Sequence, residues 1–167
     1  MSTGWPVSLV EGRVGLRPLA QGDASRWAEL RRTNAEWLAP WESTRPPHSP
    51  GGNTGYRAMT RDLIRQGKAG RALPFVVTYD KVMVGQLTVT GLTWGSARWA
   101  QIGYWIDKGY AGRGIMPLAV AMACDHCLLT MRLHRIEIAI RPENTASLRI
   151  VEKLGFHSIG LAPRYLH

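Results

Sequence analysis

The sequence predicts a single α/β domain that occupies residues 1–167. The length of 167 residues is that of one globular domain. The composition, 45% hydrophobic and 20% charged, allows a buried core. Runs with the two-residue period of strands alternate with runs of helical spacing, and no repeat or linker separates them. The longest apolar run, Ile115 to Cys124, is well short of the roughly 20 residues that span a bilayer, so we expect a soluble, cytoplasmic protein.

The first half of the chain predicts one strand and two helices. Val14 and Leu16 alternate with arginines, which indicates a strand at 12–18. Asp23 can cap a helix that runs to about Thr33. The rest of this half comprises an aromatic segment at 37–42, a loop rich in Pro, Gly and Ser at 43–52 that we expect to be mobile, and a helix at 56–66.

The second half is richer in strand-like runs. The runs at 73–79 and 82–90 meet at Asp80 and Lys81, which indicates a hairpin. A glycine turn at 112–114 separates a strand from a long helix, and Asn144 can cap the last helix. The elements expected after the hairpin are strands at 99–106, 135–140 and 156–161, and helices from 115 to about 131 and from 145 to 154.

Cys124 and Cys127 have the Cys-x-x-Cys spacing of redox and zinc sites. Two thiols cannot complete a tetrahedral zinc site, and the chain has no other cysteine. Both lie deep in the long helical run rather than at its start. We therefore expect two buried cysteines that act as small apolar residues, and no metal site.

The glycine turn is the feature most typical of a binding site. A strand, the sequence Gly112-Arg113-Gly114 and a helix follow one another, so unpaired N–H groups would lie at the positive end of the helix. Glycine would let a phosphate approach the backbone closely, because any Cβ there would stand in the way. Ile115 and Met116 replace the Lys and Ser/Thr of a Walker A loop, and Pro117 replaces the third glycine of a dinucleotide fingerprint. An ordinary strand-to-helix turn remains the alternative.

The net charge of +9 also favours a phosphate-bearing partner. Seventeen of the 21 basic residues are arginine, whose planar guanidinium suits phosphate. An arginine-rich, solvated surface would give the same count, so the charge alone does not decide between the two.

The glycine turn is one of several motifs that follow in a fixed order over nearly the whole chain. They are IGYWID at 102–107, YAGRGIM at 110–116, HRIEI at 134–138, RPENTAS at 141–147, KLGF at 153–156 and RYLH at 164–167, with WLAPWE at 37–42 ahead of them. This series resembles the Gcn5-related N-acetyltransferases (GNAT), in particular the branch of RimJ and RimL, which acetylate the N-termini of ribosomal proteins.

The resemblance implies the GNAT fold, in which helices flank a mixed, mostly antiparallel central sheet. The strand at 103–106 would splay from the strand at 135–140, and the acetyl-pantetheine arm of acetyl-CoA would enter the gap. Relatives run on after the RYLH motif into one more strand, so the resemblance also implies that the last C-terminal strand is missing.

The resemblance further implies which residues bind the cofactor. Main-chain groups of Tyr104, Trp105 and Ile106 would bind the pantetheine arm. Asn144 would hydrogen-bond the pantetheine, and Ser147 would lie near the thioester sulfur. The pyrophosphate would be held by the amides of Ala111, Gly112, Arg113, Gly114, Ile115 and Met116.

Two positions depart from the family pattern. The family prefers Gln or Arg three residues before the first loop glycine, where this chain has Gly109. Many relatives place a tyrosine general acid where this chain has Val151, which leaves Ser147 as the nearest hydroxyl.

The acceptor side is expected in the WLAPWE segment. Glu42 is the first choice for the general base and Glu137 the second, with Trp37 and Trp41 lining the acceptor pocket. The N–H of Ile106 would polarise the thioester carbonyl.

We expect an acetyl-CoA-dependent enzyme that acetylates the N-terminal amine of a protein such as a ribosomal protein. The alternatives are an acetyltransferase for a small amine, such as an antibiotic or polyamine, and a non-catalytic module that binds ribosomal RNA. No membrane partner is expected, nucleic acid only through proximity to the ribosome, and either a monomer or a dimer.

Overall fold

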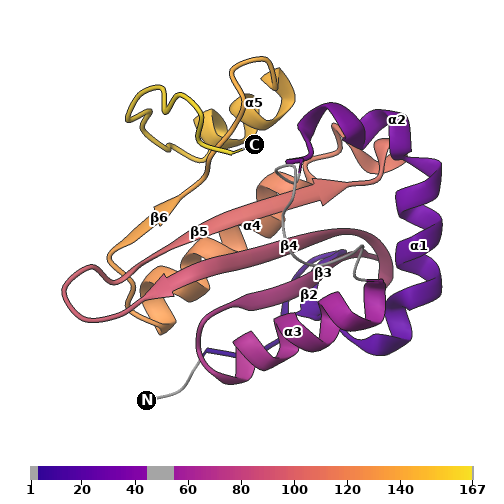
Figure 1. Ribbon diagram of the computed structural model, residues 1–167, viewed down its shortest axis with the longest axis horizontal. Coiled ribbons are helices and arrows are strands. Elements are labelled where there is room, and N and C mark those ends of the chain that lie inside the picture. The colour runs from indigo at the N-terminus through magenta and orange to yellow at the C-terminus, as the bar shows by residue number, and fades with distance from the viewer. Residues whose placement is uncertain (1–3, 45–54, 167) are drawn as a thin grey trace.

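The computed structural model describes residues 4–44 and 55–166, which form one six-stranded sheet with helices on both faces (Figure 1). The strands lie in sequence order, and every neighbouring pair is antiparallel except β5 and β6, which are parallel. Their bounds are β1 Leu9–Glu11, β2 Val14–Pro18, β3 Leu73–Tyr79, β4 Val82–Thr93, β5 Trp99–Ile106 and β6 Arg135–Glu137.

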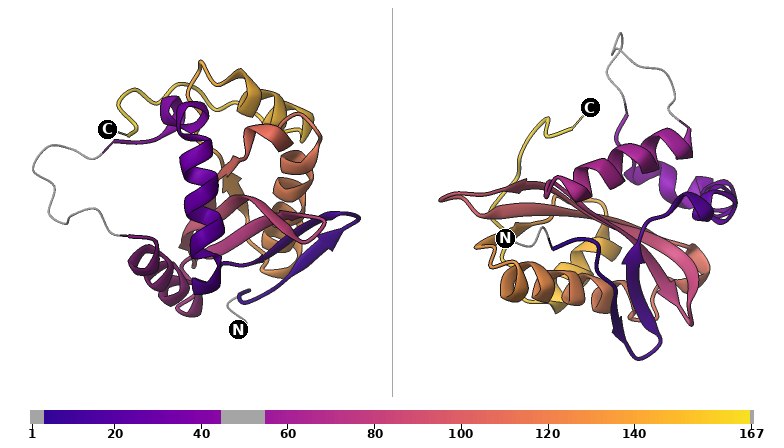
Figure 2. Two further views of the ribbon diagram at one scale, coloured as in Figure 1. Left: turned by 90° about the vertical axis from the view of Figure 1, so that its right-hand side faces the viewer. Right: turned by 90° about the horizontal axis from the view of Figure 1, so that it is seen from below.

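The helices divide between the two faces of this sheet (Figure 2). They are α1 Ala24–Thr33, α2 Ala35–Leu38, α3 Tyr56–Lys68, α4 Ile115–Asp125 and α5 Thr145–Lys153, with short 3₁₀ turns at Gln21–Asp23, Ala39–Trp41 and Lys108–Tyr110 and a π turn at His126–Thr130. The α4 face holds the larger core, in which Phe75, Leu87 and Val120 are fully buried. The α1 and α3 face holds a smaller core around Leu30 and Val76.

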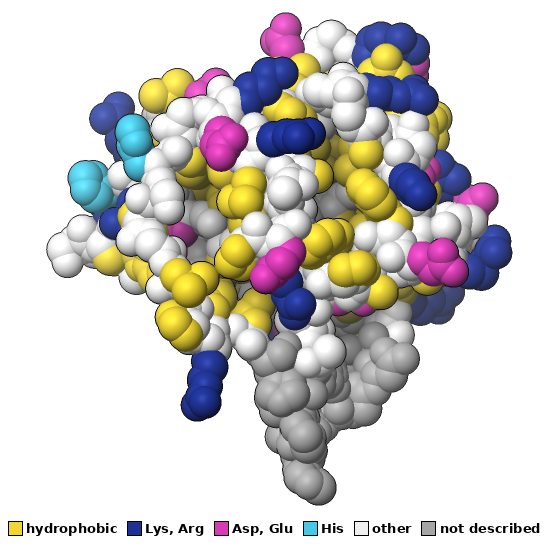
Figure 3. All heavy atoms as spheres, turned by 90° about the horizontal axis from the view of Figure 1, so that it is seen from above, with side chains coloured by type: hydrophobic (Ala, Val, Ile, Leu, Met, Phe, Trp, Pro, Cys, Tyr) yellow, Lys and Arg dark blue, Asp and Glu magenta, His cyan; other side chains and the backbone are white. Residues whose placement is uncertain are grey.

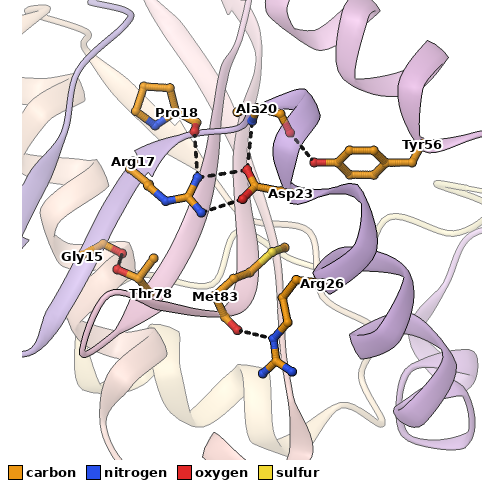
Figure 4. A network of polar contacts seen from close by, with 9 residues as sticks. All are labelled: Gly15, Arg17, Pro18, Ala20, Asp23, Arg26, Tyr56, Thr78 and Met83. Carbon is orange, nitrogen blue, oxygen red and sulfur yellow. Dashed lines mark hydrogen bonds and ion pairs between the residues drawn. The ribbon is translucent and has the colours of Figure 1, made fainter.

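Polar contacts fix α1 and α3 to the sheet (Figure 4). Arg17 on β2 donates to both carboxylate oxygens of Asp23, at 2.9 and 2.6 Å, just before α1 begins. Tyr56 on α3 donates to the Ala20 carbonyl at 2.8 Å, and Arg26 on α1 donates to the Met83 carbonyl at 3.2 Å. These bonds hold α1 across the end of the sheet where β5 finishes.

Most predicted elements are confirmed, and the differences have physical causes. The strands at 73–79 and 99–106 have the predicted bounds. The strand predicted at 135–140 ends at Glu137, because its pairing with β5 ends there. The strand predicted at 156–161 is wrong, since the structure shows coil there with Ile159 77% exposed. Strand β1 was not predicted, and most of the loop predicted at 43–52 lies outside the described residues.

The cysteines are buried as predicted, Cys127 fully and Cys124 partly. Burial raises the pKa of the Cys124 thiol to about 11 and that of Cys127 to about 12. Within residues 4–44 and 55–166, no cluster of three or more metal-ligating side chains occurs. Within the same ranges, no helix is both long and apolar enough to cross a membrane.

Candidate active site

The sheet opens where β5 leaves β6 (Figure 1). The two strands pair only through Trp99–Arg135, Ala100–Ile136 and Gln101–Glu137. The remainder of β5, from Ile102 to Ile106, has no partner on this side among the described residues. The splayed pair implied by the sequence resemblance is therefore present.

The antiparallel ladder decides which main-chain groups face the gap. The N–H of Asp107 donates to the Val84 carbonyl at 2.8 Å, so Asp107 points toward β4. The main-chain N–H and C=O groups of successive residues in a strand point to opposite edges. The main-chain groups of Trp105 therefore also face β4, whereas those of Tyr104 and Ile106 face the gap. The Ile106 carbonyl accepts a bond from Trp37 Nε1 at 3.1 Å. The groups left for a ligand are therefore the N–H and C=O of Tyr104 and the N–H of Ile106, and not those of Trp105.

Gly85 on β4 sets how closely β4 approaches this part of β5. A Cβ on Gly85 would lie 2.3 Å from the carbonyl oxygen of Trp105, which is backbone and cannot move without shifting β5. We expect Gly85→Ala to lower the free energy of unfolding by about 1–3 kcal/mol, as measured by urea denaturation. The matched control is Gly103→Ala on β5, where a Cβ meets nothing within 4 Å and stability should be retained. Equal stability of the two variants would contradict the prediction.

The glycine turn has the backbone of an anion site. Gly112 and Gly114 have φ of +74° and +75°, values that L-residues rarely adopt. The N–H groups of residues 112–116 donate to no acceptor in the described part of the chain, and they precede or begin α4. A Cβ at either glycine would meet no atom of the chain within 4 Å, so the positive φ rather than crowding by the chain requires glycine. The space in front of the turn is open, with exposed Arg113 lying 5.1 Å from the Tyr110 ring.

Helix α5 brings two further predicted residues to the gap. Asn144 is the N-cap of α5, and its Oδ1 accepts a bond from the Ser147 N–H at 3.1 Å, which leaves the amide NH₂ of Asn144 as a donor. Ser147 lies beside the side chain of Tyr104 from β5. The Tyr104 hydroxyl is buried without a hydrogen-bond partner among the described residues. Burial raises the pKa of Tyr104 more than the nearby Ser147 hydroxyl lowers it.

The opposite face of the same strands carries a hollow of about 240 Å³. It is lined by Gln86, Thr88 and Thr90 from β4 and by Gly103, Tyr104 and Trp105 from β5. Gln86 is held by Trp27, whose Nε1 donates to Gln86 Oε1 at 3.0 Å. The lining residues of β4 were missed from the sequence, although polar residues at every second position of a strand are the signal of an uncovered face.

The α1–α2 corner is attached to the end of β5. The buried Asn34 accepts a bond from the Lys108 N–H at 2.9 Å, and Trp37 donates to Ile106 as described above. Trp37 therefore contacts the site as a support for β5. The side chains that line the hollow do not include Trp37 or Trp41, and Trp41 is 40% exposed. The prediction that they line an acceptor pocket stays untested.

Neither predicted base is among the residues that line the hollow, and the two lie at different places along β5. Glu42 forms an ion pair with Arg31, whose guanidinium lies 5.4 Å from the ring of Trp105. Glu137 ends β6, forms a 2.6 Å ion pair with Arg135 and is paired in register with Gln101. Both carboxylates are partly exposed and accessible to solvent.

The gap between parallel strands, the free amides before α4 and the hollow across β5 define the class of protein as an N-acetyltransferase. The family model described as an acetyltransferase (GNAT) domain matches residues 13–157. The chain therefore belongs to the GNAT family, and its cofactor is acetyl-CoA.

Relatives and solved structures agree with this assignment. Mycobacterium smegmatis RimJ in complex with CoA-disulfide is 38% identical, with a TM-score of 0.90 over 98% of this chain and 81% of that chain. The ribosomal-protein-S5-alanine acetyltransferase of Vibrio fischeri is 30% identical, with a TM-score of 0.84 over 96% and 88%. The ribosomal protein uS5-alanine N-acetyltransferase of Escherichia coli is 29% identical over 96% of this chain and 83% of its own length. The match to Bacillus subtilis YjcK, a probable N-acetyltransferase, is 39% identical over 50% of this chain and spans 46% of that protein.

The described residues fit acetyl-CoA. The open N–H and C=O groups of Tyr104 and the open N–H of Ile106 suit the amides of a pantetheine arm, which can add to a strand edge. The free amides of the glycine turn suit a pyrophosphate. The cofactor supplies an acetyl group activated as a thioester, and the protein supplies the positions of the groups around it.

Proposed function

We propose that this enzyme acetylates the N-terminal α-amino group of a protein, with a ribosomal protein as the natural acceptor. The observation that carries the proposal is the hollow beside β4 and β5, on the face opposite α4. Strand β5 borders both the hollow and the gap, so an acceptor in the hollow would reach the gap across one strand.

The lining of the hollow suits the end of a peptide. Gln86, Thr88 and Thr90 offer hydroxyl and amide groups that can pair with main-chain N–H and C=O groups of a peptide. Trp105 offers an apolar face for a small first side chain. Such an acceptor agrees with the E. coli and V. fischeri relatives, which are named as alanine acetyltransferases for ribosomal proteins uS5 and S5.

An α-amino group is an easier acceptor than a lysine side chain. Its pKa is about 8, whereas that of lysine is about 10.4, so far more of it is neutral at pH 7. A carboxylate at the rim of the hollow would take the proton that the attacking amine loses, and we assign this role to Glu42 with Glu137 as the alternative. The N–H of Ile106 would stabilise the charge that develops on the carbonyl oxygen, and Ser147 would assist the leaving sulfur.

The face of the molecule shown in Figure 3 does not favour a nucleic acid as its partner. On the face shown in Figure 3, Lys and Arg side chains lie at several separate places with Asp and Glu among them. One cofactor needs few of the seventeen arginines, and the others can steer the anionic cofactor toward the enzyme.

A panel of acceptors tests the proposal. We expect short peptides that begin with Ala or Ser to be acetylated at the α-amine, as measured by CoA release and located by mass spectrometry. The matched controls are the same peptides with a blocked N-terminus and an internal lysine, which should react at least about tenfold more slowly because the lysine amine is mostly protonated. Activity on polyamines or aminoglycosides alone would overturn the proposed acceptor and leave the family assignment intact.

A further inference from the structure

A chain of hydrogen bonds runs from helix α1 to the wall of the hollow. Trp27 Nε1 on α1 donates to Gln86 Oε1 at 3.0 Å, and Gln86 Nε2 donates to Thr88 Oγ1 at 3.2 Å. Gln86 is only 8% exposed, so both ends of its amide are paired inside the protein, as buried polar groups usually are. Thr88 is half-buried and lines the hollow. The chain therefore ends at the Thr88 hydroxyl.

The chemistry of the groups fixes the direction of this chain. An indole N–H can only donate, so the oxygen of the Gln86 amide must face Trp27 and its NH₂ group must face Thr88. An amide NH₂ group does not accept, so the Thr88 hydroxyl cannot donate back to Gln86. No other described residue accepts the Thr88 hydrogen. The wall of the hollow therefore offers a hydroxyl donor whose hydrogen is directed away from Gln86.

Gly103 leaves the space beside Thr88 open. The two residues are direct partners in the β4–β5 ladder, so a side chain at position 103 would lie beside that of Thr88 on the same face of the sheet. A Cβ on Gly103 would meet no atom of the chain within 4 Å. Trp105, the next residue of β5 on this face, lines the hollow on one side. A ligand can therefore reach the Thr88 hydroxyl over Gly103.

We propose that Thr88 is a specificity-determining residue, whose hydroxyl donates to the main-chain carbonyl of the first residue of the acceptor. The attacking nitrogen and this carbonyl group are bonded to the same α-carbon, so a hydrogen bond that fixes the oxygen also orients the nitrogen. Polyamines have no such carbonyl. Trp27 and Gln86 are positioning residues that act through Thr88. This inference rests on the proposed function, because it assumes that the acceptor lies in the hollow.

The first test removes the donor and keeps the shape of the side chain. In Thr88→Val we expect KM for a peptide that begins with Ala to rise about tenfold, with kcat and the acetyl-CoA dissociation constant within about twofold, because the bond is made equally in the ground state and the transition state. Thr88→Ser, which keeps the hydroxyl, should have a KM near the wild-type value. The matched control is Thr93→Val, the same change at the exposed end of β4 outside the hollow, where KM should not change. A wild-type KM in Thr88→Val would overturn the inference.

The second test removes the carbonyl from the substrate. The probe is the same peptide with its first peptide bond replaced by an alkene isostere, which keeps the shape of the bond and lacks the oxygen. Thr88→Val should change kcat/KM for this probe by less than about twofold, because each partner has already lost the other. The comparison is made between enzymes on one substrate, so the pKa of its amine cancels. A tenfold effect on the isostere would show that the hydroxyl acts on another group and would overturn the inference.

The third test reverses the direction of the chain. In Gln86→Glu an ionised carboxylate can only accept, so it would accept from both Trp27 and Thr88 and turn the Thr88 hydrogen away from the hollow. At pH 9, where the carboxylate is ionised and the α-amine mostly neutral, we expect KM for the peptide to rise as far as in Thr88→Val. The double variant should be within about twofold of Thr88→Val alone. A wild-type KM in Gln86→Glu would overturn the inference, because the hydroxyl would then not act as a donor.

The last test separates this inference from the proposed function. Gly103→Val would fill the space beside Thr88, while the main-chain groups of residue 103 still face β4. We expect KM for the peptide to rise at least about tenfold, with the unfolding temperature and the acetyl-CoA dissociation constant retained. A wild-type KM in this variant would place the acceptor outside the hollow and overturn the inference alone. Wild-type enzyme that fails to acetylate any peptide would overturn the proposed function.

Discussion

Replacement of Gly112 or Gly114 by valine is expected to raise the dissociation constant for acetyl-CoA at least about tenfold while the fold survives. Both glycines have a left-handed φ, so a β-branched residue would force the turn into another conformation. The amides of residues 112–116 would then no longer converge on one anion. A tenfold change corresponds to about 1.4 kcal/mol, roughly the value of one hydrogen bond to a charged group. Calorimetry with acetyl-CoA measures the effect directly.

The control for this prediction is Gly12→Val in the turn between β1 and β2. Gly12 also has a positive φ, +57°, and a Cβ there also meets nothing within 4 Å. Its variant should therefore suffer a comparable backbone strain, seen as a lower unfolding temperature, yet bind acetyl-CoA with unchanged affinity. Unchanged affinity in the Gly112 and Gly114 variants would refute the role of the turn in phosphate binding.

The parts of the fold that could be predicted from the sequence are those that local patterns determine. The buried strands β3 and β5 have alternating or continuous apolar residues, and their bounds were predicted correctly. The end of β6 could not be predicted, because the apolar alternation continues to Ile140 while the pairing with β5 stops at Glu137. A strand depends on its partner, and the partner is distant in the sequence. The strand predicted at 156–161 was wrong for the same reason.

The candidate site shows the same limit. The glycine turn and the N-cap Asn144 are local features, and the sequence located both. From the sequence we expected the main-chain groups of Tyr104, Trp105 and Ile106 all to bind the cofactor. In the structure those of Trp105 face β4, whereas those of its two neighbours face the gap. The contact between Tyr104 and Ser147 joins β5 to α5, which the sequence alone could not bring together. The polar stripe of Gln86, Thr88 and Thr90 was visible but was interpreted only as part of a strand.

Glu42→Gln is expected to lower turnover at pH 7 by about a hundredfold, within the range of a lost general base, while acetyl-CoA binds normally. The Glu42 carboxylate forms an ion pair with Arg31. The Arg31 guanidinium lies 5.6 Å from the ring of Trp27 and 5.4 Å from the ring of Trp105, which lines the hollow. Glu42 has no contact with the β5–β6 gap among the described residues, so cofactor affinity should not change. The matched control is Glu36→Gln on α2, an exposed glutamate with no ion pair in the described structure.

The pH dependence of turnover shows whether Glu42 acts as the general base or only holds Arg31 in place. Without a base, the reaction depends on amine that is already neutral, and the fraction of neutral α-amine rises steeply up to its pKa of about 8. The deficit of Glu42→Gln should therefore be largest near pH 6.5 and should shrink strongly by pH 9. A variant that merely loses the position of Arg31 would keep the same deficit at every pH, because the guanidinium stays charged throughout this range.

Glu137→Gln decides between the two carboxylates. Glu137 pairs in register with Gln101, whose Nε2 donates to the Tyr165 hydroxyl at 2.6 Å, so it lies beside the C-terminal segment at the point where the strands begin to separate. If Glu42 is the base, Glu137→Gln should change turnover by less than about threefold and show no pH-dependent deficit. If instead Glu137→Gln shows the deficit that shrinks toward pH 9 and Glu42→Gln does not, the base is Glu137. A deficit of this form in both variants would contradict the assignment of the base to a single carboxylate.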